Sequence, residues 1–207
     1  MYNMKHIAVL ASGYGSNFQA IIEQVRNGVI PARIVRLITD NPGAYSIERA
    51  VDAGIEVRII DFRSFGARSD YDQELEQAMD ETGADLFVLA GYMRLLNDKT
   101  AAKFKGKMIN IHPSLLPSFA GLHAQKQAIE YGVKVAGCTV HFVDEGMDSG
   151  PIIIQRVVEV AETDDEELLA KKIMEHEHRA LPYAVQLFCE DRLRVDGRIV
   201  HIRAKNI

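Results

Sequence analysis

Near its start the chain reads Ile7-Ala8-Val9-Leu10-Ala11-Ser12-Gly13-Tyr14-Gly15-Ser16-Asn17, an apolar run followed by a glycine-containing loop. Five consecutive apolar residues predict a short strand that is buried on both faces, as in a parallel sheet. Apolar side chains then recur at helical spacing at Ile21, Ile22 and Val25, so the loop joins a strand to a helix. This strand–loop–helix unit favours an α/β fold with an anion site at the start of the helix.

The loop lacks the patterns of two common nucleotide sites. A dinucleotide-binding fingerprint needs glycine at the position of Phe18, and the Gly-Lys-Ser/Thr of triphosphate loops is absent. Backbone N–H groups at the helix start, with further donors from Ser16 and Asn17, therefore suit a phosphomonoester better than a pyrophosphate. The alternative is an ordinary tight turn between strand and helix, which the same residues would also form.

Strand and helix patterns alternate over the first half of the chain, which predicts a mostly parallel, Rossmann-like sheet with helices on both faces. Two later apolar runs predict an antiparallel hairpin, and a capping-box pattern at residues 163–166 predicts the start of a long helix. We expect a single domain over residues 1–207. The predicted strands are 7–11, 34–38, 57–60, 86–90, 108–111, 138–143 and 151–160, and the predicted helices are 18–25, 46–53, 69–81, 98–104, 123–131 and 163–190.

The composition of the 207 residues, 47% hydrophobic and 26% charged, is ordinary for a globular protein with a full core. The formal net charge of −5 argues against nucleic-acid binding and against a membrane-surface protein, since both favour a basic face. Small anionic substrates remain compatible with this charge. The apolar run 7–11 is too short for a signal sequence or a membrane helix, and two distant cysteines fit buried thiols in a reducing compartment. We therefore expect a cytoplasmic protein.

A second informative stretch is Asn110-Ile111-His112-Pro113-Ser114-Leu115-Leu116-Pro117, at the end of a predicted strand. Side chains alternate along a strand, so Asn110 and His112 point to the same side. Their carboxamide and imidazole can aim donors at one point, which suits a carbonyl oxygen that gains negative charge during acyl transfer. The two prolines stiffen the loop. A polar cap on a strand end is the alternative.

The loop Asp144-Glu145-Gly146-Met147-Asp148-Ser149-Gly150-Pro151 connects the strands of the predicted hairpin. Glycines on both sides of Asp148 predict a tight turn, in which its carboxylate could hold His112 protonated or relay a proton through water. A solvated acidic turn is the alternative. Calcium is not expected, because the EF-hand spacing is missing.

Several other side chains are candidates for a binding site. In Glu175-His176-Glu177-His178 the histidines point nearly opposite ways on a helix, so no shared metal is expected, but Glu177 can accept hydrogen bonds from a sugar. The segment Tyr92–Leu96 follows a parallel strand, where a flat heterocycle would fit, and a core-packing loop is the alternative. Arg68 can pair with an acidic ligand tail or be solvated, and His141 either borders the site or lies in the core.

Together these motifs resemble the phosphoribosylglycinamide formyltransferase family along essentially the whole chain. The resemblance rests on several motifs in the right order, and one departure is Ser149, where the family often has glycine. The matching segments are Ser12–Asn17, Ala90–Leu96, Asn110–Pro117, Gly121–His123, Thr139–Val143, Asp148–Pro151 and Glu175–His178.

The resemblance implies formyl transfer from 10-formyltetrahydrofolate to the amino group of glycinamide ribonucleotide, without a metal, by a monomer or homodimer. Residues 1–100 would form the ribonucleotide phosphate-binding half, and residues 101–207 the catalytic and folate-binding half. The implied catalytic residues are Asn110, His112 and Asp148. The implied ribonucleotide site is Gly15, Ser16, Asn17, Met174, Glu175, His176 and Glu177. The implied folate site is Arg68, Met93, Arg94, Leu95, Leu96, Asn110, Asp144, Glu145, Gly146, Met147 and Asp148.

Two relatives share the formyl-folate domain: methionyl-tRNA formyltransferase has an additional C-terminal domain, and formyltetrahydrofolate deformylase an N-terminal regulatory domain. At 207 residues and a net charge of −5, we expect neither. A nucleotide-binding module without chemistry would use the first loop with Asp40, but Phe18 and the Asn-x-His-Pro stretch argue against it.

Overall fold

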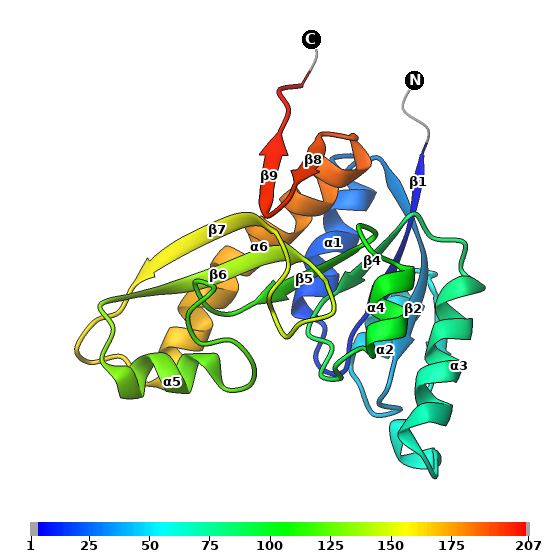
Figure 1. The fold of residues 1–207 in the computed structure, drawn as a ribbon, viewed down its shortest axis with the longest axis horizontal. Coiled ribbons are helices and arrows are strands. Elements are labelled where there is room, and N and C mark those ends of the chain that lie inside the picture. The colour runs from blue at the N-terminus through cyan, green and yellow to red at the C-terminus, as the bar shows by residue number, and fades with distance from the viewer. Residues whose placement is uncertain (1–3, 206–207) are drawn as a thin grey trace.

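Strand β1 (Lys5–Leu10) lies near the middle of one nine-stranded sheet, in a computed structural model that describes residues 4–205. The strand order is β3-β2-β1-β4-β5-β6-β7-β9-β8 (Figure 1). The other strands are β2 (Ala32–Thr39), β3 (Glu56–Ile59), β4 (Leu86–Leu89), β5 (Met108–His112), β6 (Val135–Phe142), β7 (Ile152–Glu159), β8 (Leu193–Asp196) and β9 (Ile199–Ile202).

The first five strands pair in parallel, and the chain then changes direction. β6 pairs antiparallel with β5, and β7 antiparallel with β6, which confirms the predicted hairpin. The helices are α1 (Ser16–Arg26), α2 (Ser46–Asp52), α3 (Arg68–Asp80), α4 (Asp98–Lys103), α5 (Ala124–Tyr131) and α6 (Glu166–Cys189), with a short 3₁₀ turn η1 (Phe62–Ser64). The predicted mostly parallel α/β fold is therefore confirmed.

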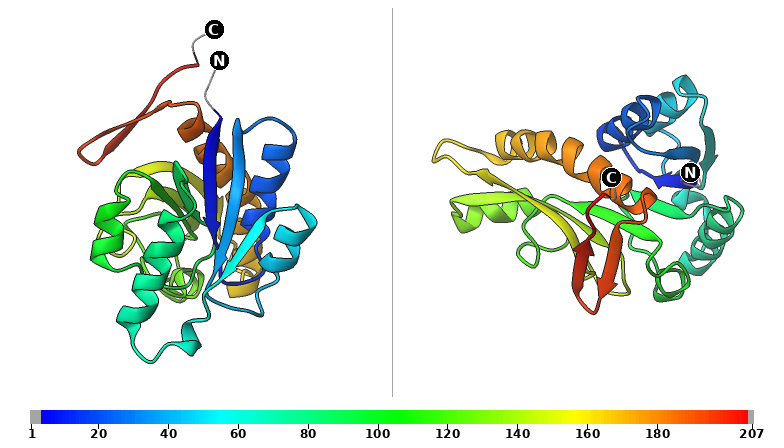
Figure 2. Two further views of the ribbon diagram at one scale, coloured as in Figure 1. Left: turned by 90° about the vertical axis from the view of Figure 1, so that its right-hand side faces the viewer. Right: turned by 90° about the horizontal axis from the view of Figure 1, so that it is seen from above.

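Two hydrophobic clusters cover the two faces of the sheet. One joins α1, α2, α5 and α6 to side chains such as Ile7 and Val9, and the other joins α3 and α4 to Ala8 and Leu10. Alternate residues of β1 thus enter opposite clusters, as a strand covered on both faces requires. Figure 2 shows the helices on both sides of the twisted sheet.

Two local predictions need correction at the C-terminal side. Asp165 caps α6 by accepting a hydrogen bond from the Leu168 N–H at 2.8 Å, so the predicted capping box at residues 163–166 is displaced. The β8–β9 hairpin was not predicted, because its short strands are mostly exposed and give little apolar pattern. Its two-residue turn is Gly197-Arg198, and a glycine at the first position of such a loop favours a hairpin and could have revealed it.

Gly137 in β6 is fixed by close packing, and this predicts a measurable loss of stability on substitution. A Cβ there would lie 1.9 Å from the Arg156 carbonyl oxygen and 2.8 Å from Leu115 Cδ2. Gly137→Ala should lower the free energy of unfolding by about 1–3 kcal/mol, as overpacking does. Gly66→Ala is the matched control, because its Cβ would meet no atom within 4 Å. Equal urea midpoints for the two variants would contradict the prediction.

Candidate functional site

The carboxylate of Asp148 joins two side chains of β5. Its Oδ1 accepts a hydrogen bond from Asn110 Nδ2 at 3.4 Å, and its Oδ2 lies 3.3 Å from His112 Nδ1. Since Asn110 and His112 are two residues apart, they point to the same side of the strand and can share one partner. The structure therefore brings together the three residues that the sequence suggested for catalysis.

Both nitrogens of His112 face hydrogen-bond acceptors. Besides Asp148 at Nδ1, its Nε2 lies 2.8 Å from the carbonyl oxygen of Phe119. An imidazolium carries an N–H on each nitrogen and can donate to both acceptors, whereas a neutral ring can donate to only one. Phe119 itself has φ +54°, which a bulky residue adopts only under strain. The loop is thus held in an unfavourable conformation that directs a carbonyl at the ring.

Asp148 lies in a tight and partly buried turn. Its φ is +48°, and its Oδ2 also accepts the Gly121 N–H at 2.9 Å. Burial opposes ionisation, but the His141 imidazole, the Gly121 N–H and the charge of His112 outweigh it and lower the pKa of the carboxyl group. Asp148 is therefore an anion at neutral pH.

His141 of β6 belongs to this cluster, which the sequence left open. Its Nδ1 donates to the Phe142 carbonyl oxygen at 2.8 Å, and its Nε2 lies 3.1 Å from Asn110 Nδ2 and 3.7 Å from Asp148 Oδ1. The ring is almost completely buried, so it fixes the orientation of the Asn110 carboxamide from behind. Asn110 and His141 are in contact because they are paired in the antiparallel β5–β6 ladder. The register of this pairing cannot be read from the sequence alone.

The loop at residues 12–17 and the start of α1 contact α6, which is far away in the sequence. Asn17 Nδ2 donates to Glu177 Oε2 at 2.8 Å, and Ser16 Oγ lies 3.6 Å from Met174 Sδ. Gly15, with φ +73°, precedes α1, and a Cβ there would lie 2.8 Å from Ser46 Cβ. Glycine is thus required for the loop to approach α2 and direct the first N–H groups of α1 outward. The seven residues predicted from the resemblance for the ribonucleotide therefore lie on two adjacent walls, with Glu175 exposed and His176 half-buried on α6.

Glu177 is buried beside this loop. Burial raises the pKa of its carboxyl group, and the Asn17 hydrogen bond only partly offsets that rise. Within residues 4–205, the Asn17 Oδ1 is also buried and has no hydrogen-bond partner. The Asn17 carboxamide is thus only partly satisfied, which suits a wall that receives hydroxyl groups.

The raised pKa of Glu177 predicts a stability effect that depends on pH. Because the pKa is higher in the folded protein, folding favours the protonated carboxyl group. Its contribution to stability is complete below the unfolded pKa of 4.5 and is lost as the pH rises through the folded pKa. Glu177→Gln should therefore unfold at higher urea than the wild type at pH 7.5, by about 1.4 kcal/mol per unit of pKa shift. The difference should shrink at pH 4.5. A variant less stable than wild type at pH 7.5 would refute this.

The segment predicted for the folate lies beside β1 at the carboxyl ends of the strands. The Met93 N–H donates to Ser12 Oγ at 2.9 Å, and Arg68 donates to the Leu95 carbonyl oxygen. Arg94 Nε donates to Asp40 Oδ2 at 2.7 Å, and its guanidinium lies 4.0 Å from the centroid of the Phe62 ring. These bonds order the backbone of the segment.

Exposure differs along the two stretches that the sequence assigned to the folate. Met93 and Leu95 remain exposed while Leu96 is buried, so the segment presents apolar side chains on a fixed backbone. In the second stretch, Met147 is exposed and Asp144 accepts the Ser149 hydroxyl at 2.6 Å. Glu145, which adjoins it, lies 3.8 Å from Lys105 Nζ, and Gly146 donates to Asp144 Oδ1 at 3.2 Å.

The candidate site lies where the strand order reverses. The Ser12 N–H donates to the Gly91 carbonyl oxygen at 3.1 Å, so the loops after β1 and β4 meet there. β1 and β4 are neighbours, while the chain continues outward to β2 and β3 on one side and to β5 on the other. Open α/β sheets bind ligands in such crevices at the carboxyl ends of strands.

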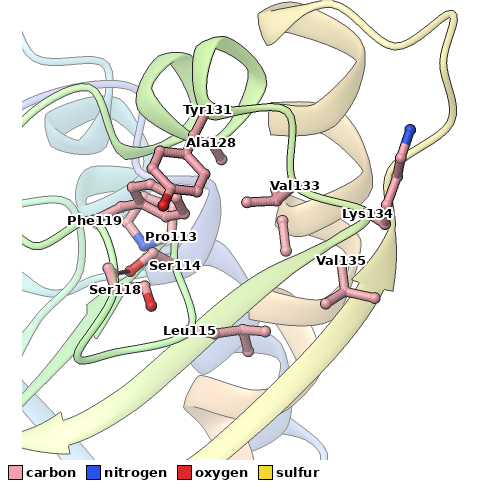
Figure 3. A pocket seen from close by; sticks show the side chains of 11 residues that line it. Pro113, Ser114, Leu115, Ser118, Phe119, Ala128, Tyr131, Val133, Lys134 and Val135 are labelled. Atoms are coloured by element: carbon pink, nitrogen blue, oxygen red, sulfur yellow. Dashed lines mark hydrogen bonds between the residues drawn. The ribbon is translucent and has the colours of Figure 1, made fainter.

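One cavity adjoins this site but does not contain its polar cluster. It has a volume of about 590 Å³ and lies between the loop at Pro113–Phe119 and the segment at Ala128–Ala136 (Figure 3). Its lining is mostly apolar, with the Tyr131 ring packed edge-on against Phe119 at 5.9 Å. Asn110, His112 and Asp148 do not line it. The cavity therefore offers no reason to move the candidate site.

Two kinds of feature are absent from residues 4–205. No helix in that range is long and apolar enough to cross a membrane. No group of three or more His, Cys, Asp or Glu side chains there is arranged to hold a metal ion.

Comparisons with known proteins agree on one family. The model of the formyl transferase family matches residues 5–185. The trifunctional purine biosynthetic protein adenosine-3 of Drosophila melanogaster is 45% identical over 88% of this chain, which spans only 14% of that longer protein. The phosphoribosylglycinamide formyltransferase of Haemophilus influenzae is 39% identical, over 98% of this chain and 95% of the relative.

A solved structure gives the same result for the fold. The glycinamide ribonucleotide transformylase 1 of Symbiobacterium toebii matches with a TM-score of 0.93 and 48% identity, over 96% of this chain and 94% of that one. The residues matched by the family model, 5–185, include the strands and loops that form the site described above. By the family model and by these relatives, the chain belongs to the formyl transferase family.

Proposed function

We propose that the protein transfers the formyl group of 10-formyltetrahydrofolate to the amino group of glycinamide ribonucleotide, a step of purine biosynthesis. The observation that carries the proposal is the Asp148 carboxylate shared by Asn110 and His112. This cluster adjoins the loop at Ser12–Asn17 and the segment at Met93–Leu96, because β1, β4 and β5 are neighbours in the sheet. The names of two bacterial relatives, a phosphoribosylglycinamide formyltransferase and a glycinamide ribonucleotide transformylase, support the same reaction.

The ribonucleotide is assigned to the wall between α1 and α6. The N–H groups at Gly15, Ser16 and Asn17 receive the phosphate, because the start of a helix favours an anion. Glu177 accepts hydrogen bonds from the ribose, and Met174, Glu175 and His176 complete the wall. In this arrangement residues 1–100 supply the phosphate site and part of the folate site, and residues 101–207 supply catalysis and the rest of the folate site.

The formyl donor is assigned to the other side of β5. Its flat ring system packs against Met93, Leu95 and Leu96, with backbone groups of Arg94 within reach, and Arg68 pairs with its acidic tail. The Asp144–Asp148 stretch closes over it, with Glu145, Gly146 and Met147 at the edge. The formyl carbon then lies between the substrate amine and the Asn110–His112 pair.

The chemistry follows from where charge develops. The amine attacks the formyl carbon, and a C–N bond forms as the carbonyl π electrons move to oxygen. Asn110 and the protonated His112 donate hydrogen bonds to this oxyanion, for which His112 gives up its contact with the Phe119 carbonyl oxygen and keeps the one with Asp148. Collapse breaks the bond to the folate nitrogen, which receives a proton from His112, while the amine releases its proton through water to Asp148. The products are the formylated ribonucleotide and tetrahydrofolate.

The experiment that tests the proposal is a formyl-transfer assay. The protein is mixed with 10-formyltetrahydrofolate, with and without glycinamide ribonucleotide, and the folate product is followed by absorbance. Product that depends on the ribonucleotide is the expected result. Equal release of tetrahydrofolate without it would indicate a deformylase instead, and no product in either mixture would overturn the proposal.

A further inference from the structure

Arg49 of α2 lies against the loop assigned to the phosphate. Its Nε donates to the Tyr14 carbonyl oxygen at 2.9 Å, and its Nη1 donates to Gln19 Oε1 at 3.2 Å. Its Cδ would lie 3.4 Å from a Cβ built on Gly15. The side chain therefore extends along the loop and across the first turn of α1, beside the N–H groups at the helix start.

Two aromatic rings hold the guanidinium in place. Its central carbon lies 4.6 Å from the centroid of the Tyr14 ring and 5.0 Å from that of Tyr45. The two rings stack on each other with centroids 5.0 Å apart and planes at 11°. Stacking and hydrogen bonding together fix a side chain that would otherwise sample many rotamers. None of these partners is a carboxylate, so they leave the positive charge available.

The charges around the loop explain why a cation is needed there. Residues 12–19 contain no lysine or arginine, while Glu177 of α6 faces the loop through its hydrogen bond with Asn17. A phosphate dianion at the start of α1 would experience this carboxylate. Arg49, whose Nε bonds the Tyr14 carbonyl oxygen, places a positive charge at the loop that offsets it.

We propose that Arg49 is a phosphate-binding residue, which supplies the positive charge for the 5′-phosphate of the ribonucleotide and selects phosphorylated over unphosphorylated substrates. The proposal rests on the assigned reaction and adds a residue to it. The sequence does not reveal Arg49, because it stands 32 positions after Asn17 and only the packing of α2 against α1 brings it to the loop.

The test compares two substrates in two proteins. Steady-state formyl transfer is measured for wild type and Arg49→Gln, with glycinamide ribonucleotide and with its dephosphorylated riboside. Loss of one charge-assisted hydrogen bond predicts a roughly 10- to 100-fold fall in kcat/KM for the ribonucleotide, mostly in KM. The riboside, which lacks the phosphate, should show less than about a twofold change. KM for the formyl folate should also stay the same.

Two further variants keep the outcome decisive. Arg49→Lys retains the positive charge but lacks the forked donors of the guanidinium, so an intermediate fall in kcat/KM is expected for the ribonucleotide alone. This variant still tests the proposal if Arg49→Gln does not fold. Arg26→Gln, at the end of α1, removes an equal charge away from the loop and should behave as wild type. Equal losses on both substrates would mean a structural role and overturn the inference. Wild-type protein inactive on the ribonucleotide would instead reject the assigned reaction.

Discussion

Replacing His112 by alanine should leave a folded protein with kcat lowered by about 10²–10³, the usual cost of one lost donor to an oxyanion. The reason is chemical: alanine has no N–H to donate, whereas the ring of His112 is oriented by Asp148 at one nitrogen and by the Phe119 carbonyl at the other. Asn110→Ala should cost a similar factor, because the two side chains face the same point. The measurement is single-turnover formyl transfer at saturating substrates.

Both variants need a check on folding, since His112 is buried and Asn110 contacts His141. Far-UV circular dichroism and binding of a folate analogue should match wild type for each variant. A soluble His112→Ala protein that retained more than about a tenth of wild-type turnover would remove His112 from the mechanism.

Replacing Asp148 by asparagine should lower kcat by roughly 10²–10⁴, the range that general acid–base groups contribute. The substitution keeps the shape but removes the negative charge, and its amide would present N–H groups to donors at Asn110, His112 or Gly121. Both the charge that stabilises the imidazolium and the proton acceptor are then lost. Asp52→Asn, an exposed change at the end of α2, is the control and should retain full activity.

The same variant has a signature in stability. The pKa of Asp148 is lowered in the folded protein, so the ionised carboxylate stabilises the fold at pH values above the unfolded pKa of 3.8. This stabilisation is lost as the pH falls through the folded pKa. Asp148→Asn should therefore be less stable than wild type at pH 7, and the gap should close below pH 3.8. A gap that is constant across this range would mean that the charge contributes nothing.

Much of the fold could be predicted because buried parallel strands give an unbroken apolar signal. Residues 86–89 and 108–112 are almost wholly buried on both faces, and their predicted bounds differ from the observed ones by a single residue. The β8–β9 hairpin has the opposite character, since exposed strands are selected for solubility and carry no such run.

The site was predictable only where its residues are close in sequence or carry distinctive side chains. Asn110 and His112 share one strand, so their common direction follows from alternation. The Phe119 carbonyl that holds His112 has no signature, because every residue has a carbonyl group. Asn17 and Glu177 are 160 residues apart, and their hydrogen bond depends on how α6 crosses α1.

The path of α6 also bears on how this enzyme could have been assembled in evolution. Its buried face contributes Ile173, Leu181 and Val185 to the same cluster as β1 and α1, and Glu177 completes the wall of the first loop. A gene fragment that encoded only residues 1–100 would leave that cluster open to water and the loop without its opposite wall. The loop at residues 12–17 therefore depends on a helix far along the chain: recombination could move this fold only as one unit, or would have to supply another helix in place of α6.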